Sequence, residues 1–128
     1  MRLLIDTHAL LWWLRNERPL SRTARQAIAE AEPPRFFSVA GAWEMAIKCS
    51  TGKLKLSVTV GRLLDEHLPL NHAALLGITL NDLIRLESLP RHHRDPFDRM
   101  MAAQALERDL TIASADPIFE KYGVKRVW

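Results

Sequence analysis

Cysteine is almost missing from the sequence, since Cys49 is the only one among 128 residues. A lone thiol cannot form an internal disulfide and gives too few sulfur ligands for a zinc knuckle, so we expect a reducing compartment. Long apolar runs are missing as well. The run "ALLWWL" (residues 9–14) is too short to cross a bilayer, and Asp6 and His8 precede it, unlike the apolar segment of a signal peptide. We therefore expect a soluble, cytoplasmic protein with no membrane partner.

A strong charge of one sign is also lacking. The 18 Lys and Arg residues outnumber the 15 Asp and Glu residues by three, giving a formal net charge of +3. This mild basic excess permits a nucleic-acid partner without requiring one. Hydrophobic residues make up 48% of the chain, which is enough for a buried core. The length is close to the commonest domain size, so we expect residues 1–128 to form a single domain.

Short apolar segments alternate with helical patterns along the whole chain. The strand segments read as continuous apolar runs, which is typical of a parallel sheet covered by helices on both faces. The alternation predicts an α/β fold, a three-layer α/β/α sandwich with a mostly parallel sheet. We expect strands over 2–6, 35–39, 74–78, 110–114 and 124–128, helices over 8–15, 22–31, 40–51, 60–67, 80–88 and 97–108, and a helical turn over 116–122.

Four acidic residues fall where the strands of such a sheet end. Asp6 closes the first strand, Asp116 lies two residues beyond "LTIAS", Glu44 is in the first turns of the helix after "RFFSV", and Asp98 is in the first turn of the helix after "RHHRDP". Right-handed crossovers bring these positions to one edge of the sheet, where α/β proteins bind ligands. Clustered carboxylates repel one another, and an all-oxygen set suits a hard cation such as Mg²⁺ or Mn²⁺. This arrangement fits metal-assisted cleavage of a phosphodiester.

Each of these acids also has a purely structural interpretation. Asp6 and Asp98 are suited to the N-termini of helices, and Asp116 before Pro117 is a common turn. Glu44 lies in an apolar segment and has Lys48 four residues later as a possible ion-pair partner. Their shared edge is what favours a site.

The quoted motifs resemble one family over essentially the whole chain. "LLIDTHALLWWL", "SVAGAWEMAIKCSTGKLKL", "HHRDPFDRMMAAQALERDLTIASADPIFEKY" and "VKRVW" are similar to the PIN domain, and more narrowly to the VapC-type toxins of bacterial type II toxin–antitoxin systems. The resemblance implies an endoribonuclease that uses Mg²⁺, with Mn²⁺ as a substitute, to hydrolyse RNA. It also implies a homodimer and a small cognate antitoxin protein. The family's four catalytic, metal-holding acids fall on Asp6, Glu44, Asp98 and Asp116.

The resemblance also places hydroxyls near the metal, at Thr7 and Ser114. Gly41 and Cys49 depart from the expected helix residues of the Glu44 motif; we expect Gly41 to soften the helix start and Cys49 to be a small buried residue. Arg99 is expected to grip phosphate or to pair with a neighbouring acid.

Other polar residues of "HHRDPFDR" receive structural interpretations. The adjacent His92 and His93 lack the spacing of a helical metal pair, and we expect solvated loop residues. Asp95 before Pro96 is expected to cap the helix. Packing or capping is the favoured role of His8, and the tryptophans are expected in the core or at an interface.

Three further functions remain alternatives. A zinc hydrolase would use His92, His93 and Asp95 or Asp98. A phospho-acceptor or nucleic-acid-binding module would use the acids as a charge sensor. A receiver-like domain needs a phosphorylatable Asp at the end of a central strand and a later strand that ends in Lys; the predicted strands "RFFSV" and "ALLGI" supply no such Asp, and no predicted strand ends in Lys. A PIN-domain nuclease of RNA processing would share the chemistry without being a toxin.

Overall fold

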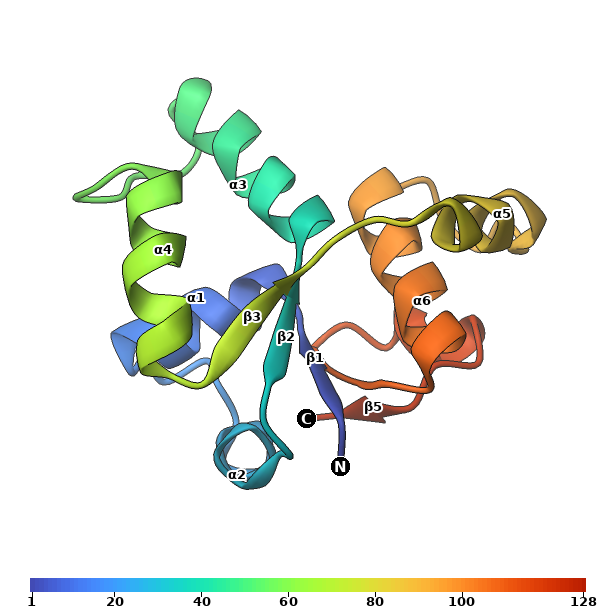
Figure 1. Ribbon diagram of the computed structural model, residues 1–128, viewed down its shortest axis with the longest axis horizontal. Coiled ribbons are helices and arrows are strands. Elements are labelled where there is room, and N and C mark those ends of the chain that lie inside the picture. The colour runs from blue at the N-terminus through green and yellow to red at the C-terminus, as the bar shows by residue number, and fades with distance from the viewer.

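The computed structural model describes residues 1–128 and contains a five-stranded sheet in which every neighbouring pair of strands is parallel. The order across the sheet is β3-β2-β1-β4-β5, so β1 lies at the centre (Figure 1). This is the predicted α/β architecture, and it is fully parallel. The strands are β1 (Leu3–Ile5), β2 (Arg35–Ser38), β3 (Ala73–Leu76), β4 (Thr111–Ala113) and β5 (Arg126–Val127).

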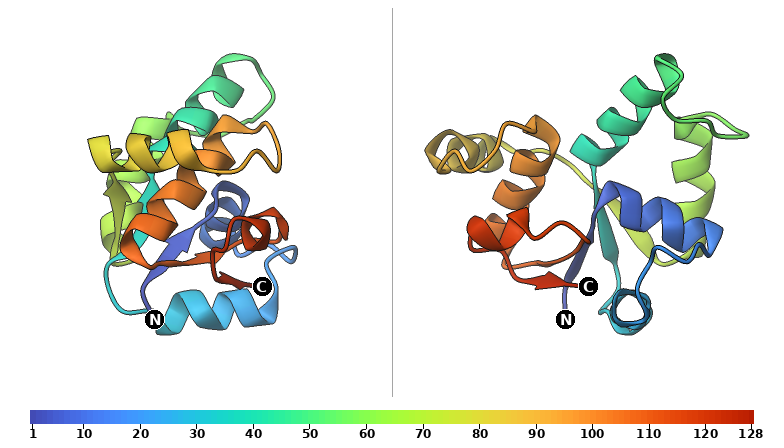
Figure 2. Two further views of the ribbon diagram at one scale, coloured as in Figure 1. Left: turned by 90° about the vertical axis from the view of Figure 1, so that its right-hand side faces the viewer. Right: turned by 180° about the vertical axis from the view of Figure 1, so that it is seen from behind.

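Helices cover both faces of this sheet. In Figures 1 and 2, α1, α2 and α4 lie on one side and α5, α6 and α7 on the other, while α3 continues beyond the carboxyl ends of the strands. Both termini lie away from α3, near α2. The helices are α1 (Thr7–Arg15), α2 (Arg22–Glu30), α3 (Val39–Ser50), α4 (Val60–Leu70), α5 (Leu80–Ser88), α6 (Pro96–Arg108) and α7 (Ile118–Lys121).

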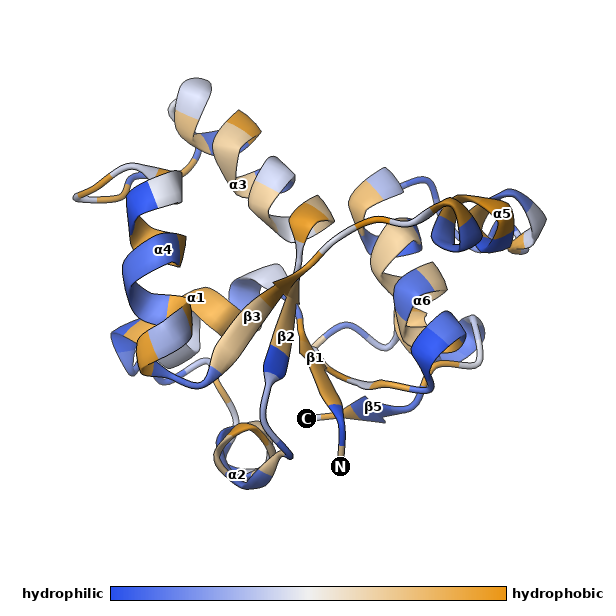
Figure 3. Cartoon of the chain, in the orientation of Figure 1, coloured by the Kyte–Doolittle hydropathy of each residue, from blue (hydrophilic) through white to orange (hydrophobic).

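The central strand divides its side chains between two cores. Leu3 and Ile5 belong to the cluster with α1, α2 and α4, whereas Leu4 belongs to the cluster with α6 and α7. All three are fully buried, as expected when successive side chains of a strand point to opposite faces and both faces are covered. In Figure 3, β1 and β3 are coloured mainly as hydrophobic, whereas β5 at the edge of the sheet is largely blue.

Several helix starts follow directly from the sequence. Ser21 accepts a hydrogen bond from the backbone N–H of Ala24, and Asp95 accepts from Phe97 and Asp98, so the caps expected at both positions are confirmed. The predicted helix over 60–67 is too short, because α4 runs on to Leu70. No helix is long and apolar enough to span a membrane.

A buried polar contact fixes α6 against the edge of the sheet. The Ser38 hydroxyl caps α3 at the backbone N–H of Ala40 and donates to the Gln104 side-chain oxygen. The Gln104 amide in turn donates to the carbonyls of Leu76 and Gly77, just beyond β3. Ser38 and Gln104 are both fully buried, and a satisfied polar network of this kind favours one arrangement of the packed elements. It holds α6, the helix of Asp98, in register with the carboxyl ends of β2 and β3.

Candidate functional site

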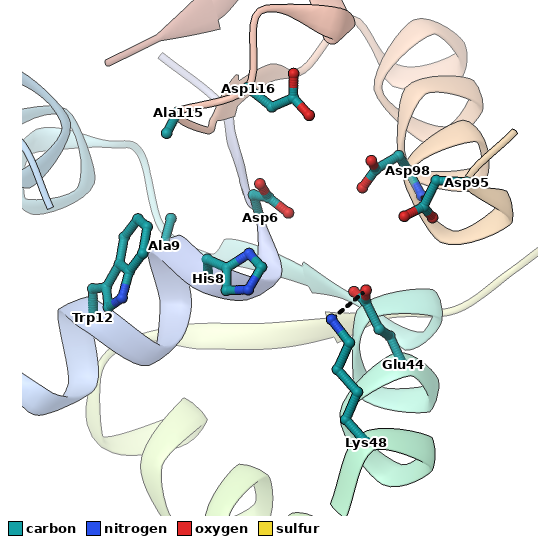
Figure 4. Close-up of a pocket in the computed structure, with 10 residues that line it drawn as sticks. All are labelled: Asp6, His8, Ala9, Trp12, Glu44, Lys48, Asp95, Asp98, Ala115 and Asp116. Carbon is teal, nitrogen blue, oxygen red and sulfur yellow. Dashed lines mark hydrogen bonds and ion pairs between the residues drawn. The ribbon is translucent and has the colours of Figure 1, made fainter. Parts of the chain in front are cut away.

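A pocket of about 250 Å³ opens at the carboxyl edge of the sheet (Figure 4). Its walls come from α1, α3, the start of α6 and the turn after β4. Five carboxylates line it, together with one lysine and one histidine. The lining residues are Asp6, His8, Ala9, Trp12, Glu44, Lys48, Asp95, Asp98, Ala115 and Asp116. The four acids that the sequence singled out therefore share one pocket, although they are separated by tens of residues along the chain.

Asp6 occupies the centre of this edge. The strand ends at Ile5, one residue earlier than expected, and Asp6 is the N-cap of α1. Its Oδ1 accepts from the backbone N–H of Thr7 at 2.7 Å, and its Oδ2 accepts from the Ser114 hydroxyl at 2.6 Å. Burial raises the pKa of Asp6 above its ordinary value, and the hydrogen bond from Ser114 works in the opposite direction. Asp6 therefore both caps α1 and lines the pocket.

Ser114 links Asp6 to Asp116. While donating to Asp6, the fully buried hydroxyl accepts the backbone N–H of Asp116 at 3.1 Å. The exposed Asp116 accepts the backbone N–H of Ile118 at 2.9 Å through Oδ1. The turn interpretation of Asp116 is therefore correct, and the same turn places its carboxylate at the pocket (Figure 4).

Glu44 reaches into the pocket from α3 and forms an ion pair with Lys48. Its Oε2 lies 3.0 Å from Nζ of Lys48 one turn later, which is the ion pair considered from the sequence. Glu44 is 8% exposed. Figure 4 shows both side chains reaching into the same space, so Lys48 offsets part of the negative charge of the five carboxylates.

The helix that carries Glu44 comes unusually close to α1 and β2 at Gly41. A Cβ at this position would lie 2.8 Å from the Phe37 ring and 2.9 Å from Oγ1 of Thr7. Gly41 therefore has a role that the sequence did not indicate, because glycine is needed here for close packing. Thr7 is 3% exposed and its hydroxyl has no hydrogen-bond partner, so its hydrogen bond to the Asp6 carboxylate comes from the backbone N–H. Cys49 is half-buried rather than buried.

Asp98 and Asp95 project from the first turn of α6. Asp95 accepts from two backbone N–H groups at 2.9 and 3.0 Å, and its carboxylate also lines the pocket. Burial raises the pKa of Asp98 to about 8, and the nearby charges of Asp95, Asp6, Glu44 and Asp116 add to the effect. Each further negative charge makes ionisation of Asp98 harder, so the pocket favours a proton or a cation beside it.

His93 contradicts the expectation of a solvated loop residue. Its side chain is 21% exposed, its Nε2 lies 3.3 Å from Oδ2 of Asp98, and its Nδ1 lies 2.7 Å from the Tyr122 hydroxyl. The neighbouring His92 is exposed and packs edge-on against the Tyr122 ring without a hydrogen bond to it. Both histidine rings pack against the Tyr122 ring, and only His93 bonds to its hydroxyl. The single tyrosine lies 29 residues further along the chain, so the sequence did not indicate it as the partner of His93.

Arg99 neither lines the pocket nor pairs with an acid, so both expectations for this residue are wrong. The guanidinium is buried, and it donates to the carbonyls of Pro90 and Leu89 and to the Tyr122 hydroxyl. One helical position after Asp98, its side chain points away from the pocket. It reaches Asp98 only indirectly, through Tyr122 and His93.

The donor set of the pocket fits a hard divalent cation. Mg²⁺ prefers oxygen ligands and commonly takes one or two carboxylates, with several waters and substrate phosphate oxygens as its other ligands. The five carboxylates around this small pocket can supply the protein ligands. No three acidic, histidine or cysteine side chains stand close enough to hold one ion as they are placed. The zinc alternative gains no support, because His92 faces the Tyr122 ring and His93 is bonded to the Tyr122 hydroxyl.

Comparison with known proteins identifies the family to which this protein belongs. Residues 3–125 match the PIN domain family, so the chain belongs to the PIN domain family. This confirms the resemblance drawn from the sequence motifs.

Particular relatives narrow the comparison. The chain is 27% identical over 114 residues to ribonuclease VapC22 of Mycobacterium tuberculosis, a match that spans 88% of this chain and 85% of the relative. Its fold is similar to that of DNA-bound VapBC from Salmonella typhimurium, with a TM-score of 0.68 and 16% identity over 98% of this chain and 96% of that one. VapBC2 from Rickettsia felis, bound to a promoter DNA fragment, gives a TM-score of 0.70 and 12% identity over 98% and 97% of the two chains.

Proposed function

We propose that this PIN-domain protein is a metal-dependent endoribonuclease that hydrolyses phosphodiester bonds in RNA with Mg²⁺ or Mn²⁺. The observation that carries the proposal is the convergence of Asp6, Glu44, Asp98 and Asp116 on one pocket at the carboxyl edge of the sheet. Its relative VapC22 is named a ribonuclease. A phosphate-rich substrate is also consistent with the net charge of +3.

The position of each acid in the pocket suggests its role in holding the cation. Asp6 and Asp98 are proposed to hold the cation directly, because both are largely buried and lie on facing walls. Glu44 and Asp116 complete the acidic cluster, directly or through water. A bound divalent cation would lower the pKa of a water molecule and offset the negative charge of the phosphate in the transition state.

Two residues prepare these carboxylates. Ser114 holds one oxygen of Asp6 and the backbone of Asp116, so it sets the distance between two of the acids. Lys48 holds Glu44, and it is the only lysine or arginine that lines the pocket. A phosphate oxygen arriving with the substrate would offer Lys48 a second anionic partner.

The test is cleavage of a mixed RNA pool by the purified protein, with and without Mg²⁺. Asp6→Asn keeps an oxygen to cap α1 and an amide that can face the Ser114 hydroxyl, so the fold is expected to persist while Mg²⁺-dependent cleavage falls by at least about 100-fold. Asp109→Asn is the control, because Asp109 is exposed at the far end of α6. Full activity of folded Asp6→Asn would reject the assigned role.

We further propose that the protein is a toxin, neutralised by a small cognate antitoxin. Support comes from solved structures of similar fold, which are VapBC complexes. A small DNA-binding protein encoded in the neighbouring reading frame, whose co-expression abolishes RNA cleavage, is the expected finding. Cleavage that persists in a stable complex of the two would instead favour a PIN-domain nuclease of RNA processing.

A homodimer is the expected assembly of this toxin. Large apolar side chains are exposed on α3 and α5, where no part of the same chain covers them, and surfaces of this kind mark protein contacts. Sedimentation of the wild-type protein should give twice the mass of one chain, and Ile84→Glu should give single chains. The exposed apolar residues of these two helices include Trp43, Ile47, Leu80, Leu83 and Ile84.

A further inference from the structure

A chain of three hydrogen bonds runs from the interior of the protein to the back of Asp98. The Arg99 guanidinium donates to the Tyr122 hydroxyl at 3.1 Å, and that hydroxyl lies 2.7 Å from Nδ1 of His93. Nε2 of His93 lies 3.3 Å from Oδ2 of Asp98. None of Arg99, Tyr122 and His93 lines the pocket, so the chain approaches the carboxylate from behind.

The donors and acceptors of this chain can be assigned from chemistry. A guanidinium has only donors, so the Tyr122 oxygen accepts from Arg99. The single hydroxyl proton of Tyr122 is then directed at Nδ1 of His93, which becomes an acceptor. A neutral imidazole that accepts at Nδ1 carries its proton on Nε2 and donates from there to Asp98. Every proton points the same way, from Arg99 towards the pocket.

The loop before α6 is held at its beginning and at its middle by two neighbouring residues of that helix. Arg99 binds the Pro90 and Leu89 carbonyls, where the loop begins. Asp98, the residue next to Arg99, receives His93 from the middle of the loop. Tyr122 closes the gap between the two, with the Arg99 guanidinium 5.7 Å above its ring and the His93 ring 5.5 Å away. The loop therefore cannot shift without changing the contact to Asp98.

We propose that His93 and Tyr122 are positioning residues that orient the Asp98 carboxylate for a divalent cation. His93 contacts Oδ2 and leaves Oδ1 free for a cation, and the Asp98 side chain lines the pocket (Figure 4). Outer partners of this type orient metal ligands, and their loss commonly weakens metal affinity by about 10- to 100-fold. The role rests on the proposed function, whereas the geometry of the relay does not.

The first experiment therefore needs no metal. Nitrogen NMR of the His93 ring at about pH 8, where an ordinary imidazole is neutral, should show a proton on Nε2 and none on Nδ1. Tyr122→Phe removes only the hydroxyl and should lessen this preference. A proton on Nδ1 in the wild-type protein overturns the relay.

The second experiment titrates Mg²⁺ alone into the protein and measures its affinity by calorimetry. His93→Ala and Tyr122→Phe should each weaken binding, His93→Ala by about 10-fold. The double variant should be no weaker than His93→Ala, because the two residues act in one chain. His92→Ala is the matched control: it removes a neighbouring imidazole that touches the same ring without a hydrogen bond, and it should bind Mg²⁺ within about twofold of wild type.

The outcomes separate the two proposals. Unchanged affinity in folded Tyr122→Phe, or additive losses in the double variant, overturns the positioning role. Should His93→Ala fail to fold, Tyr122→Phe decides the question alone, since it retains the ring that packs beneath the loop. A wild-type protein that binds no Mg²⁺ overturns the proposed function, while the NMR measurement still decides whether the relay exists.

Discussion

The metal-free protein should become more stable when Asp98 is replaced by asparagine. Burial, and after it the charges of four other carboxylates, raise the pKa of Asp98 from an ordinary 3.8 to about 8. Between about pH 4 and pH 8 the folded state holds a proton that the unfolded state has released, so stability falls as the pH rises through this window. The amide of the Asp98→Asn variant cannot ionise, and its oxygen can still accept from His93.

The magnitude follows from the size of this shift. About four pKa units at 1.36 kcal/mol each give an upper limit of about 5–6 kcal/mol. The Asp98 side chain is 18% exposed and part of the repulsion acts through solvent, so we expect about 2–3 kcal/mol of stabilisation above pH 8. The benefit should shrink towards zero near pH 4, where both states of the wild type carry the proton.

Urea unfolding in the presence of a chelator, at a series of pH values, measures the effect. Asp109→Asn is the control, because it removes the same charge from an exposed position, and its pH dependence should follow that of wild type. Adding Mg²⁺ should then stabilise wild type and leave the Asp98→Asn variant almost unchanged. A variant no more stable than wild type at pH 8 would refute the argument that the pocket is electrostatically strained without a cation.

Three other perturbations test separate parts of the structure. Gly41→Ala should destabilise the protein by about 1–3 kcal/mol in urea unfolding, because the added Cβ would meet buried atoms. Gly61→Ala is the control: there is open space around Gly61, and the variant should be more stable by up to about 1 kcal/mol. Equal effects of the two substitutions would contradict the packing argument. Asp82→Asn should lower the free energy of unfolding by about 3 kcal/mol at neutral pH, because it leaves Arg108 without its buried partner at 2.7 Å. Burial opposes ionisation of Asp82, but hydrogen bonds, first that from Arg108, outweigh burial and lower the pKa of Asp82. The stabilisation by the ionised Asp82 should therefore be lost only below about pH 4. Lys48→Gln should tighten Mg²⁺ binding about fivefold in calorimetry, because one positive charge leaves the pocket; weaker binding would contradict competition between Lys48 and the cation.

The fold could be predicted from the sequence because its signals are local. Apolar runs such as "LLI" indicate buried strands. Ser21 and Asp95 indicate helix starts, because their side chains can accept hydrogen bonds from the first backbone N–H groups of a helix. The shared edge of Asp6, Glu44, Asp98 and Asp116 followed from one topological rule about parallel sheets. Only the exact element ends differed, as at α4.

The supporting contacts of the site could not be predicted, because they depend on distances between remote segments. The side chain of His93 finds Tyr122 and Asp98, and nothing within its own loop indicates either partner. Arg99 was expected at the pocket, yet the helical turn directs it to the opposite side of Asp98. Gly41 shows the same limit in part, since a Cβ there would meet Thr7, at the start of α1, as well as Phe37.

The central claim is that the carboxylate pocket, once it holds a divalent cation, cleaves RNA. The most direct measurement is the initial rate of RNA cleavage as a function of Mg²⁺ concentration, for wild type and for folded Asp98→Asn at the same protein concentration. The account predicts a rate that rises to saturation with Mg²⁺ in wild type and falls by at least about 100-fold in Asp98→Asn. Equal Mg²⁺-dependent rates for the two proteins would contradict it.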